Sequence, residues 1–436
     1  MKVDRINRIN RMLLLKNATF IDWQTLAFKT THILVEEGKD GKVFFHDRIT
    51  AGLDPGKTLD CTGLLVTKSF ACGHHHVYSA LARGMPPPRQ APKDFHEILQ
   101  HIWWKLDRCL SLEMIRASAL HTAIACAKNG VTFVIDHHAS PRAVEGSLEA
   151  IAGAFDEVGL GHLLCYETSD RDGEAVARQG LEETESYLSA GRPGLVGLHA
   201  SFTVGDDTMG RAVSLAQQYG SGIHIHVAED PVDQKHCKRE YGKRVVERLR
   251  DFGVTEMPKS ILVHCLHLKR RERKIMSQAR SYIACNTESN LNNNVGYFDS
   301  RGLGGNIMLG TDGMHSDMLR SARAAYFVGQ GFDDIGLPEA YARFRKVHHY
   351  LRENNFSGDV DNNLVVLDYD SPTPLHPGNF PAHFIFGLEG RHVRHVISSG
   401  KLIVRDGVVQ TVEEQEVLRL ARGLSARLWE RMGAVE

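Results

Sequence analysis

The stretch Gly73-His74-His75-His76 lies just after an apolar run, Gly63-Leu64-Leu65-Val66-Thr67-Lys68-Ser69-Phe70-Ala71. If this run is a β-strand, His74 and His76 point to one face and His75 to the other, because side chains alternate along a strand. Two imidazoles that leave a strand end on one face form half of a transition-metal site. The alternative is a solvated loop or an expression tag, and the rest of the chain has to decide between a metal site and this alternative.

Composition limits the class of protein. The chain has 436 residues, a net charge of −1 and no strongly basic block, which argues against nucleic acid or an anionic membrane as a partner. Its eight cysteines are scattered without a CxxC pair, a pattern that suits a reducing cytoplasm. No stretch is apolar and long enough to span a bilayer. Residues 1–11 are basic and polar and lack a signal-peptide core; they are either native or a leader ahead of Met12.

A change of pattern divides the chain into two kinds of segment. Residues 1–66 and 359–436 are rich in short strands, with a C-terminal helix, and we expect the two ends to join in one small β-sandwich. Residues 67–358 alternate strands and helices, which predicts an α/β protein built on a (β/α)8 TIM-type barrel. An open doubly wound sheet would need a Gly-rich phosphate turn, and none is present. The candidate strands are 65–73, 131–136, 162–166, 195–199, 222–226, 260–264, 282–286 and 306–311.

Each predicted strand ends in ionisable or polar side chains, where a barrel of this type builds its active site. Three histidines and one acid form a suitable set for zinc or ferrous iron: His74, His76, His226 and Asp312. Strand one lies beside strand eight in a barrel, so Asp312 can close the site next to the first two histidines. The pattern therefore favours a metal site over the solvated loop.

Two further residues suit proton transfer beside that metal. Glu229 lies three residues past His226, where a general acid/base can move a proton from activated water to a leaving group. His264 follows the next strand and could hydrogen-bond the water or a developing oxyanion.

The remaining polar strand ends are candidates for substrate binding, with support of the metal ligands as the alternative. His224 shares a face with His226 but lies one layer deeper, which predicts a structural role. Trp103-Trp104 could wall a pocket, although an aromatic pair in a helix more often packs in a core. The candidates for substrate binding are His137, His138, Glu167, His199 and Asn290.

Several motifs resemble the amidohydrolase superfamily, in the branch of the cytosine, guanine and adenosine-type deaminases and the triazine chlorohydrolases. The likeness covers nearly the whole chain from Met12 onward. A second group of motifs, within residues 134–141, 166–168 and 370–375, resembles the SsnA-type aminohydrolases of that branch. The motifs of the first group are Gly73-His74-His75-His76, Tyr78-Ser79-Ala80-Leu81-Ala82-Arg83-Gly84-Met85, His226-Val227-Ala228-Glu229, Leu262-Val263-His264 and Leu309-Gly310-Thr311-Asp312-Gly313.

The resemblance implies a barrel with a flanking β-sandwich, a dimer or larger homo-oligomer, and one divalent metal, zinc first and iron second. It carries the metal ligands over to His74, His76, His226 and Asp312, the proton shuttle to Glu229 and the histidine beside the water to His264. Relatives with two metals use a lysine on the fourth strand. Here that strand ends in Leu198-His199-Ala200, so one metal is favoured.

Two stretches depart from the family pattern. Lys68-Ser69 replaces the usual Pro-Gly before the first ligands, a change that we expect to alter loop stiffness rather than chemistry. The segment before Leu364 is short and reads Asn354-Asn355-Phe356-Ser357-Gly358, so the docking of the sandwich is the part of the fold that the resemblance leaves open.

The function that we expect is hydrolytic deamination of an amino-substituted nitrogen heterocycle, purine- or pyrimidine-like, by metal-activated water with release of ammonia. The same site could instead open a cyclic amide or ureide, or dechlorinate a triazine-like ring. A third alternative is an inactive barrel that serves as an interaction scaffold. The sequence of such an inactive barrel would lack some metal ligands, and none of the expected metal ligands is missing here.

Overall fold

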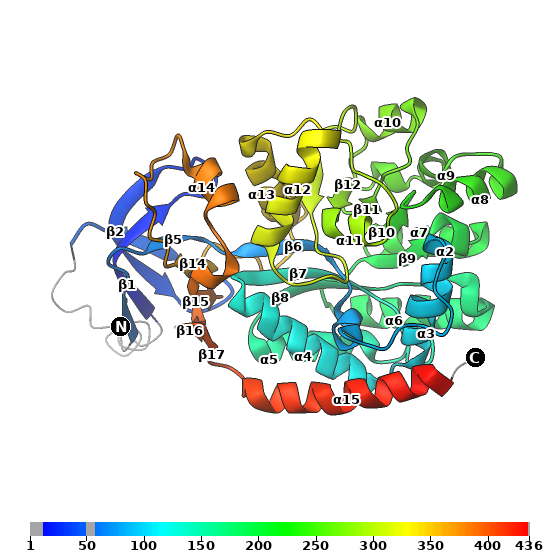
Figure 1. Cartoon of the computed structure of the whole chain (residues 1–436), viewed down its shortest axis with the longest axis horizontal. Helices are drawn as coiled ribbons and strands as arrows, with labels where there is room; N and C mark the ends of the chain where they lie inside the picture. The colour runs from blue at the N-terminus through cyan, green and yellow to red at the C-terminus, as the bar shows by residue number, and fades with distance from the viewer. Residues whose placement is uncertain (1–11, 49–56, 435–436) are drawn as a thin grey trace.

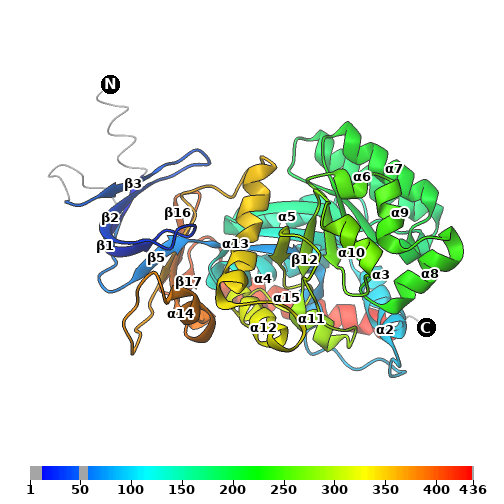
Figure 2. The same cartoon turned by 90° about the horizontal axis from the view of Figure 1, so that it is seen from above.

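A computed structural model of the protein describes residues 12–48 and 57–434. The origin of residues 1–11 is therefore a question outside the described residues. Strands from both chain ends gather at one side of the molecule, and the alternating strands and helices of the middle form a larger body beside them (Figures 1 and 2). No helix in the described ranges combines the length and the apolar character needed to cross a membrane.

Eight parallel strands of the described chain follow one another around the larger body. They pair as β6-β7-β8 and as β9 to β13. Isolated parallel bridges join Thr168 to Leu198 and His75 to Asp312, so the two groups meet on both sides. This mixed α/β arrangement is of the TIM-barrel type. The strands are β6 (Phe70–His75), β7 (Val131–His138), β8 (Gly161–Tyr166), β9 (Val196–Ala200), β10 (Ile223–Val227), β11 (Ile261–His264), β12 (Tyr282–Cys285) and β13 (Ile307–Leu309).

Helices connect these strands and cover their outer face (Figure 2). The side chain of Ser111 caps the first of them by accepting from the backbone N–H of Met114. The helical pattern over 233–250 predicts one helix, but the chain forms two, because Gly242 at φ 67° ends the first. The helices are α4 (Leu112–Lys128), α5 (Ser147–Val158), α6 (Glu174–Ser189), α7 (Asp206–Gln218), α8 (Pro231–Tyr241), α9 (Val245–Asp251), α10 (Arg270–Met276), α11 (Thr287–Asn292), α12 (Met318–Phe332) and α13 (Leu337–Glu353).

Strands from both chain ends share one hydrogen-bonded sheet. Its order is β17-β16-β15-β14-β5-β1-β2-β3, with β4 beside β1. A short helix, α14 (Phe380–Phe386), follows β14 in the chain and packs on α12 and α13. The strands are β1 (Met12–Ile21), β2 (Phe28–Glu36), β3 (Val43–His46), β4 (Lys57–Asp60), β5 (Leu65–Lys68), β14 (Leu364–Leu367), β15 (Val393–Ser398), β16 (Lys401–Arg405) and β17 (Val408–Val409).

The run 65–73, predicted as one strand, is divided between the two bodies. β5 ends at Lys68 and pairs with β14 in the terminal sheet, whereas β6 begins at Phe70 and pairs with β7. The backbone changes partner at this point: the N–H of Ser69 bonds the carbonyl of Asn363, and that of Phe70 bonds Gly130. The prediction of a single strand was wrong because both halves are apolar, and apolar character does not reveal which sheet a segment joins.

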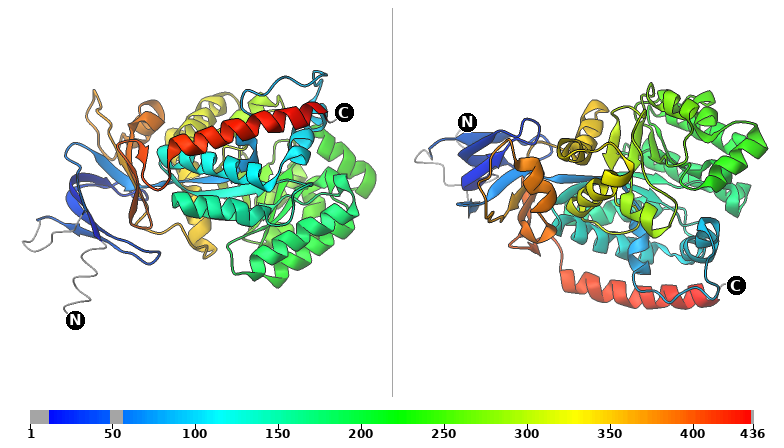
Figure 3. Two further views of the ribbon diagram at one scale, coloured as in Figure 1. Left: turned by 90° about the horizontal axis from the view of Figure 1, so that it is seen from below. Right: turned by 45° about the horizontal axis from the view of Figure 1, so that its top comes forward.

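The C-terminal helix α15 (Glu414–Ala434) runs along the barrel against α4, α3 (Trp104–Cys109) and the short helix η1 (Val77–Ala82) (Figure 3). The indole N–H of Trp429 donates to the carbonyl of Leu81 at 2.9 Å. Arg431 donates to the carbonyl of Cys109 at 3.1 Å, which satisfies a carbonyl at the end of α3. The last helix thus supports the segment that follows His74 and His76.

A buried ion pair joins the terminal sheet to the barrel. The ammonium of Lys68 lies 2.8 Å from the carboxylate of Asp359, and each side chain is 4% exposed. The Nδ1–H of His348 donates to the same carboxylate at 2.8 Å. Burial alone would raise the pKa of Asp359, but His348 and Lys68 outweigh burial and hold that pKa well below its usual range.

The two stretches that depart from the family pattern are therefore partners. Lys68 comes from the substituted Lys68-Ser69 pair, and Asp359 directly follows the short segment 354–358. Arg345 of α13 donates to the carbonyls of Lys68 and Ser69 at 3.0 and 2.8 Å. The expectation of a change in loop stiffness alone was incomplete, because Lys68 also holds the two bodies together.

Removing one charge of this pair is expected to destabilise the protein strongly. Asp359→Asn leaves the ammonium of Lys68 buried and uncompensated, which costs about 3–5 kcal/mol. The matched control is Asp47→Asn, which breaks an exposed pair with Lys29 and should cost less than about 1 kcal/mol. Urea unfolding curves of both variants provide the test, and equal shifts in the two would contradict it.

His348 is expected to make the fold sensitive to acid. Burial lowers the pKa of His348 to about 4 in the folded protein. Above pH 6.5 this histidine is neutral in both states, whereas between pH 6.5 and 4 the unfolded chain binds a proton that the folded protein does not. Stability therefore falls as the pH drops through this window, by up to about 1.4 kcal/mol per pH unit. Urea midpoints at pH 7 and 4.5 should show a smaller loss for His348→Gln than for the wild type.

Candidate metal centre and substrate pocket

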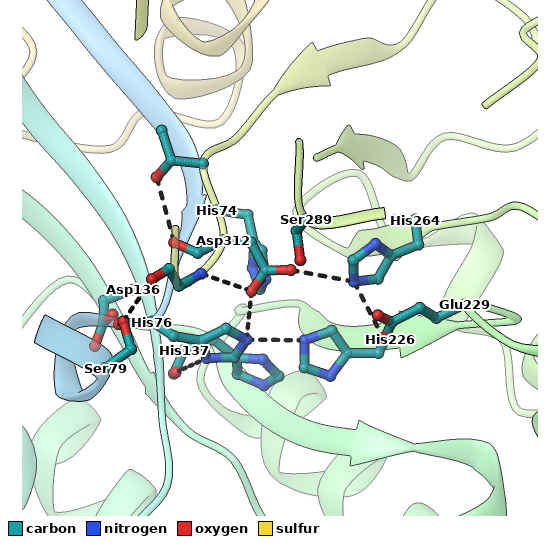
Figure 4. A network of polar contacts seen from close by, with 12 residues as sticks. His74, His76, Ser79, Asp136, His137, His226, Glu229, His264, Ser289 and Asp312 are labelled. Atoms are coloured by element: carbon teal, nitrogen blue, oxygen red, sulfur yellow. Dashed lines mark hydrogen bonds and ion pairs between the residues drawn. The ribbon is translucent and has the colours of Figure 1, made fainter. Parts of the chain in front are cut away.

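Side chains from three strand ends converge at one end of the ring of strands (Figure 4). His74 and His76 come from the end of β6, His226 from β10, and Asp312 follows β13. The Nε2 atoms of His76 and His226 lie 3.1 Å apart. Oδ1 of Asp312 lies 3.3 Å from Nε2 of His76 and 3.8 Å from Nε2 of His74. The structure thus brings together the four residues predicted as ligands.

Backbone carbonyls set the tautomers of His76 and His226. Nδ1 of His76 lies 2.6 Å from the carbonyl of His137, and Nδ1 of His226 lies 2.9 Å from that of His199. A carbonyl can only accept, so both Nδ1 atoms carry hydrogen. Burial lowers the pKa of both rings, which are therefore neutral, and each Nε2 presents a lone pair.

A chain of three hydrogen bonds sets the tautomer of His74. The thiol of Cys165 donates to the carbonyl of Asp136 at 3.4 Å, so its sulfur accepts from Nδ1–H of His224 at 3.5 Å. Nε2 of His224 then accepts from Nδ1–H of His74 at 3.0 Å. The deeper histidine has the structural role that its position predicts, because it turns the lone pair of His74 Nε2 toward the centre.

Three imidazole lone pairs facing one another require a cation. Nε2 of His74 is buried and has no hydrogen-bond partner within the described ranges, and Nε2 of His76 faces the lone pair of His226. Tetrahedral zinc with bonds of about 2.0–2.1 Å separates its ligand atoms by about 3.4 Å, close to the spacings found here. The residues present therefore fit a divalent metal.

His137 is a second candidate for the fourth ligand. Ring nitrogens of His74, His76, His137 and His226 lie within 4.8 Å of one another. However, the ring of His137 stacks on that of His224 with centroids 4.5 Å apart, whereas Oδ1 of Asp312 lies 3.3 Å from Nε2 of His76 and adds a negative charge. The chemistry of the donor set therefore favours Asp312, with His137 beneath it.

Glu229 and His264 lie beside this centre. Oε2 of Glu229 is 3.5 Å from Nε2 of His264, which is 3.7 Å from Oδ2 of Asp312. Burial, and then the charge of Asp312, raises the pKa of Glu229 well above its usual value. Nδ1–H of His264 donates to Oδ1 of Asn290 at 2.7 Å, so Asn290, which was predicted to bind substrate, contacts His264. The arrangement can hold and move a proton.

The backbone around the centre is strained. Ala228, His264, Cys265 and Asp312 all have positive φ, between 47° and 67°. Such values cost free energy for residues other than glycine and persist where the surrounding structure holds them. All four residues lie at or just after the carboxyl ends of β10, β11 and β13.

A cavity of about 100 Å³ adjoins the candidate ligands. Of the predicted substrate residues, Glu167 and His199 line it, whereas His137 and His138 do not; Nε2 of His138 bonds Ser140 instead. Trp103 and Trp104 both line this cavity and also pack against the hydrophobic core, so they combine the two roles that the sequence left as alternatives.

Asp107 also lines the cavity and was missed by the sequence analysis. Its carboxylate pairs with Arg171, whose guanidinium lies 5.2 Å from the ring centre of Trp104. Burial raises the pKa of Asp107 despite this arginine. Its sequence position, two residues before the end of a helix, carries no mark of a pocket residue.

Comparisons with known proteins agree with this geometry. The sequence pattern of the amidohydrolase family matches residues 65–341. The chain belongs to this family. It is 24% identical to a 5-methylthioadenosine/S-adenosylhomocysteine deaminase of Desulforamulus reducens, over 95% of this chain and 99% of that protein. It is 28% identical to a 5'-deoxyadenosine deaminase of Methanopyrus kandleri, over 90% of each.

A solved structure shares the fold. The adenosine deaminase of Xanthomonas campestris with bound zinc superposes with a TM-score of 0.81 at 18% identity, over 97% of this chain and 99% of that one. The resemblance to the amidohydrolase superfamily is thereby confirmed. The narrower likeness to the SsnA-type aminohydrolases stays a prediction, as do the individual roles of the site residues.

The two neighbouring histidines of the first motif are expected to differ in their effect on metal binding. His76→Asn removes a nitrogen aimed at the centre, so purified protein should lose most of its zinc. The matched control is His75→Asn, because His75 lies on the other face and its Nε2 bonds Ser316 at 3.2 Å. That variant should keep about one zinc per chain by elemental analysis. Loss of zinc in the His75 variant, with the fold intact by circular dichroism, would exclude this arrangement.

Proposed function

We propose that this protein is a metal-dependent aminohydrolase that deaminates an amino-substituted nitrogen heterocycle, purine- or pyrimidine-like, and releases ammonia. The observation that carries the proposal is the position of Glu229, a buried carboxyl group 3.5 Å from His264 and beside three converging imidazole nitrogens. The match to the amidohydrolase family and the deaminase names of its relatives support the same reaction.

His74, His76, His226 and Asp312 would hold one divalent ion, zinc first and iron second, since three neutral imidazoles and one carboxylate suit both metals. A zinc ion in that position lowers the pKa of a water molecule to about 7 and so supplies a nucleophile at neutral pH. Asp312 is suited to accept a proton from this water: Oδ1 faces the histidines, and Oδ2 points toward His264 at 3.7 Å.

Glu229 would carry the proton to the substrate. Its raised pKa favours the protonated carboxyl group, and that proton would be given to a ring nitrogen as the water oxygen bonds the neighbouring carbon. The lone pair of His264 Nε2 accepts a hydrogen bond from the attacking water. Transfer of the water's second proton to the amino group would let ammonia leave, and return of the proton held by Asp312 to Glu229 would restore both carboxyl groups. The net change replaces C–NH₂ by C=O.

The pocket residues would then have separate tasks. Glu167 and His199 line the cavity and are proposed to contact the substrate. His137 and His138 are proposed to support the ligands from behind, and Asn290 to orient His264, in place of the direct substrate contacts first expected.

We also propose that the protein is a cytoplasmic homodimer that acts on a small-molecule substrate. All eight cysteines are free and buried, which suits a reducing compartment.

The product distinguishes this reaction from its alternatives. A screen of amino-substituted purines, pyrimidines and triazines should release ammonia. Ring opening would instead create a carboxylate, and dechlorination would release chloride. Carboxylate or chloride as the sole product would exclude deamination.

Glu229→Gln should abolish most turnover without loss of metal. The amide cannot carry a proton, so kcat should fall by about 100-fold or more, the size of general acid–base effects. Glu240→Gln on the surface of α8 serves as the matched control and should leave both zinc content and kcat unchanged. Near-normal activity of the Glu229 variant would rule out its assigned role.

A further inference from the structure

Two cavities meet at one tryptophan. The inner cavity, beside the candidate ligands, has a volume of about 100 Å³. An outer cavity of about 690 Å³ is lined by Phe202, Lys235, His236 and Tyr241 among others. Trp104 is the one residue that lines both, so its indole ring forms the wall between them.

The inner cavity is small for a ligand site. Sites for drug-sized ligands usually measure about 300–1,000 Å³. An engineered cavity of about 150 Å³ holds benzene, so 100 Å³ has room for about one small ring. That is the size of one heterocyclic base. A nucleoside has about twice as many non-hydrogen atoms as its base, so its sugar needs space outside the inner cavity. The outer cavity adjoins it across Trp104.

Contacts on several sides hold Trp104 in place. Its ring lies 5.5 Å from that of His96 and 6.1 Å from that of His199, which itself lines the inner cavity. The guanidinium of Arg171 lies over its face at 5.2 Å.

Two ion pairs fasten the helix that carries this tryptophan. Arg171 pairs with Asp107 of α3, and Arg108 pairs with Asp172 at 2.6 Å. Each pair joins α3 to the turn at residues 170–172, which follows β8. The wall is therefore fastened to the barrel rather than being a free side chain.

We infer that the pocket takes a free heterocyclic base and excludes the corresponding nucleoside, and that Trp104 is the residue that sets this limit. The inference rests on the proposed function and narrows its substrate class. It separates this chain from its two reported relatives, which are named for the deamination of adenine nucleosides.

The zinc-loaded wild-type protein tests the substrate class directly. Ammonia release is measured for matched pairs: adenine and adenosine, guanine and guanosine, cytosine and cytidine. In each active pair, kcat/KM for the base should exceed that for the nucleoside by at least about 100-fold, because the sugar does not fit beside the base in the inner cavity. A nucleoside that is turned over as well as its base overturns the inference but leaves the proposed function standing.

Binding measurements distinguish the size limit of the pocket from the proposed deamination. If no compound releases ammonia, the proposed deamination fails, and calorimetric titration with the same pairs then tests the pocket alone. Tighter binding of bases than of nucleosides supports the size limit, and equal or weaker binding of bases overturns it.

Substitution of the wall tests the role of Trp104. Trp104→Ala joins the inner cavity to the outer one, so the base-to-nucleoside ratio of kcat/KM should fall at least about tenfold. Trp103→Ala is the matched control, because Trp103 lines only the inner cavity and its loss leaves the wall in place. The control should keep the wild-type preference.

Zinc content and thermal midpoints show whether the variants fold. If Trp104→Ala does not fold, Trp104→Leu takes its place, since it keeps an apolar side chain while shortening the wall. A folded, zinc-loaded variant at position 104 that retains the wild-type ratio would contradict the role of this residue.

Discussion

The centre depends on backbone carbonyls that can accept hydrogen bonds but cannot donate them. The carbonyls of His137 and His199 take the Nδ1 hydrogens of His76 and His226, and the carbonyl of Asp136 ends the chain through Cys165 and His224 to His74. Each acceptor belongs to a strand of the ring, so the fold itself turns three lone pairs toward one point. Burial keeps the rings neutral, and a divalent cation relieves the repulsion between them.

The joint between the two bodies shows how substitutions at separate positions can depend on one another. Lys68 would be a buried, unpaired charge without Asp359, and Asp359 reaches it because the segment before β14 is short. Arg345 binds the carbonyls on either side of the strand exchange at Ser69. Since β6 begins one residue later and carries His74 and His76, the same joint also places the first half of the metal centre.

Much of the site could be predicted from the sequence because its functional side chains lie at the ends of predicted strands. His74, His76, His226 and Asp312 follow apolar runs whose alternation predicts strands, and a ring of parallel strands delivers its carboxyl ends to one place. Other parts could not be predicted. The apolar run 65–73 does not show where one sheet ends, Asn290 does not show that it orients His264, and Asp107 and Trp104 lie in a helix of ordinary composition.

By itself the sequence determined the alternation of strands and helices, the identity of the candidate ligands and proton carrier, and the family. These follow from local patterns of apolar and polar residues, which do not depend on what lies across the molecule. Only the tertiary structure decided the tautomers, the exchange of partners at Ser69, the pairing of Lys68 with Asp359 and the wall made by Trp104. Each of these arises from contacts between segments far apart in the chain, and a local sequence pattern does not predict such contacts.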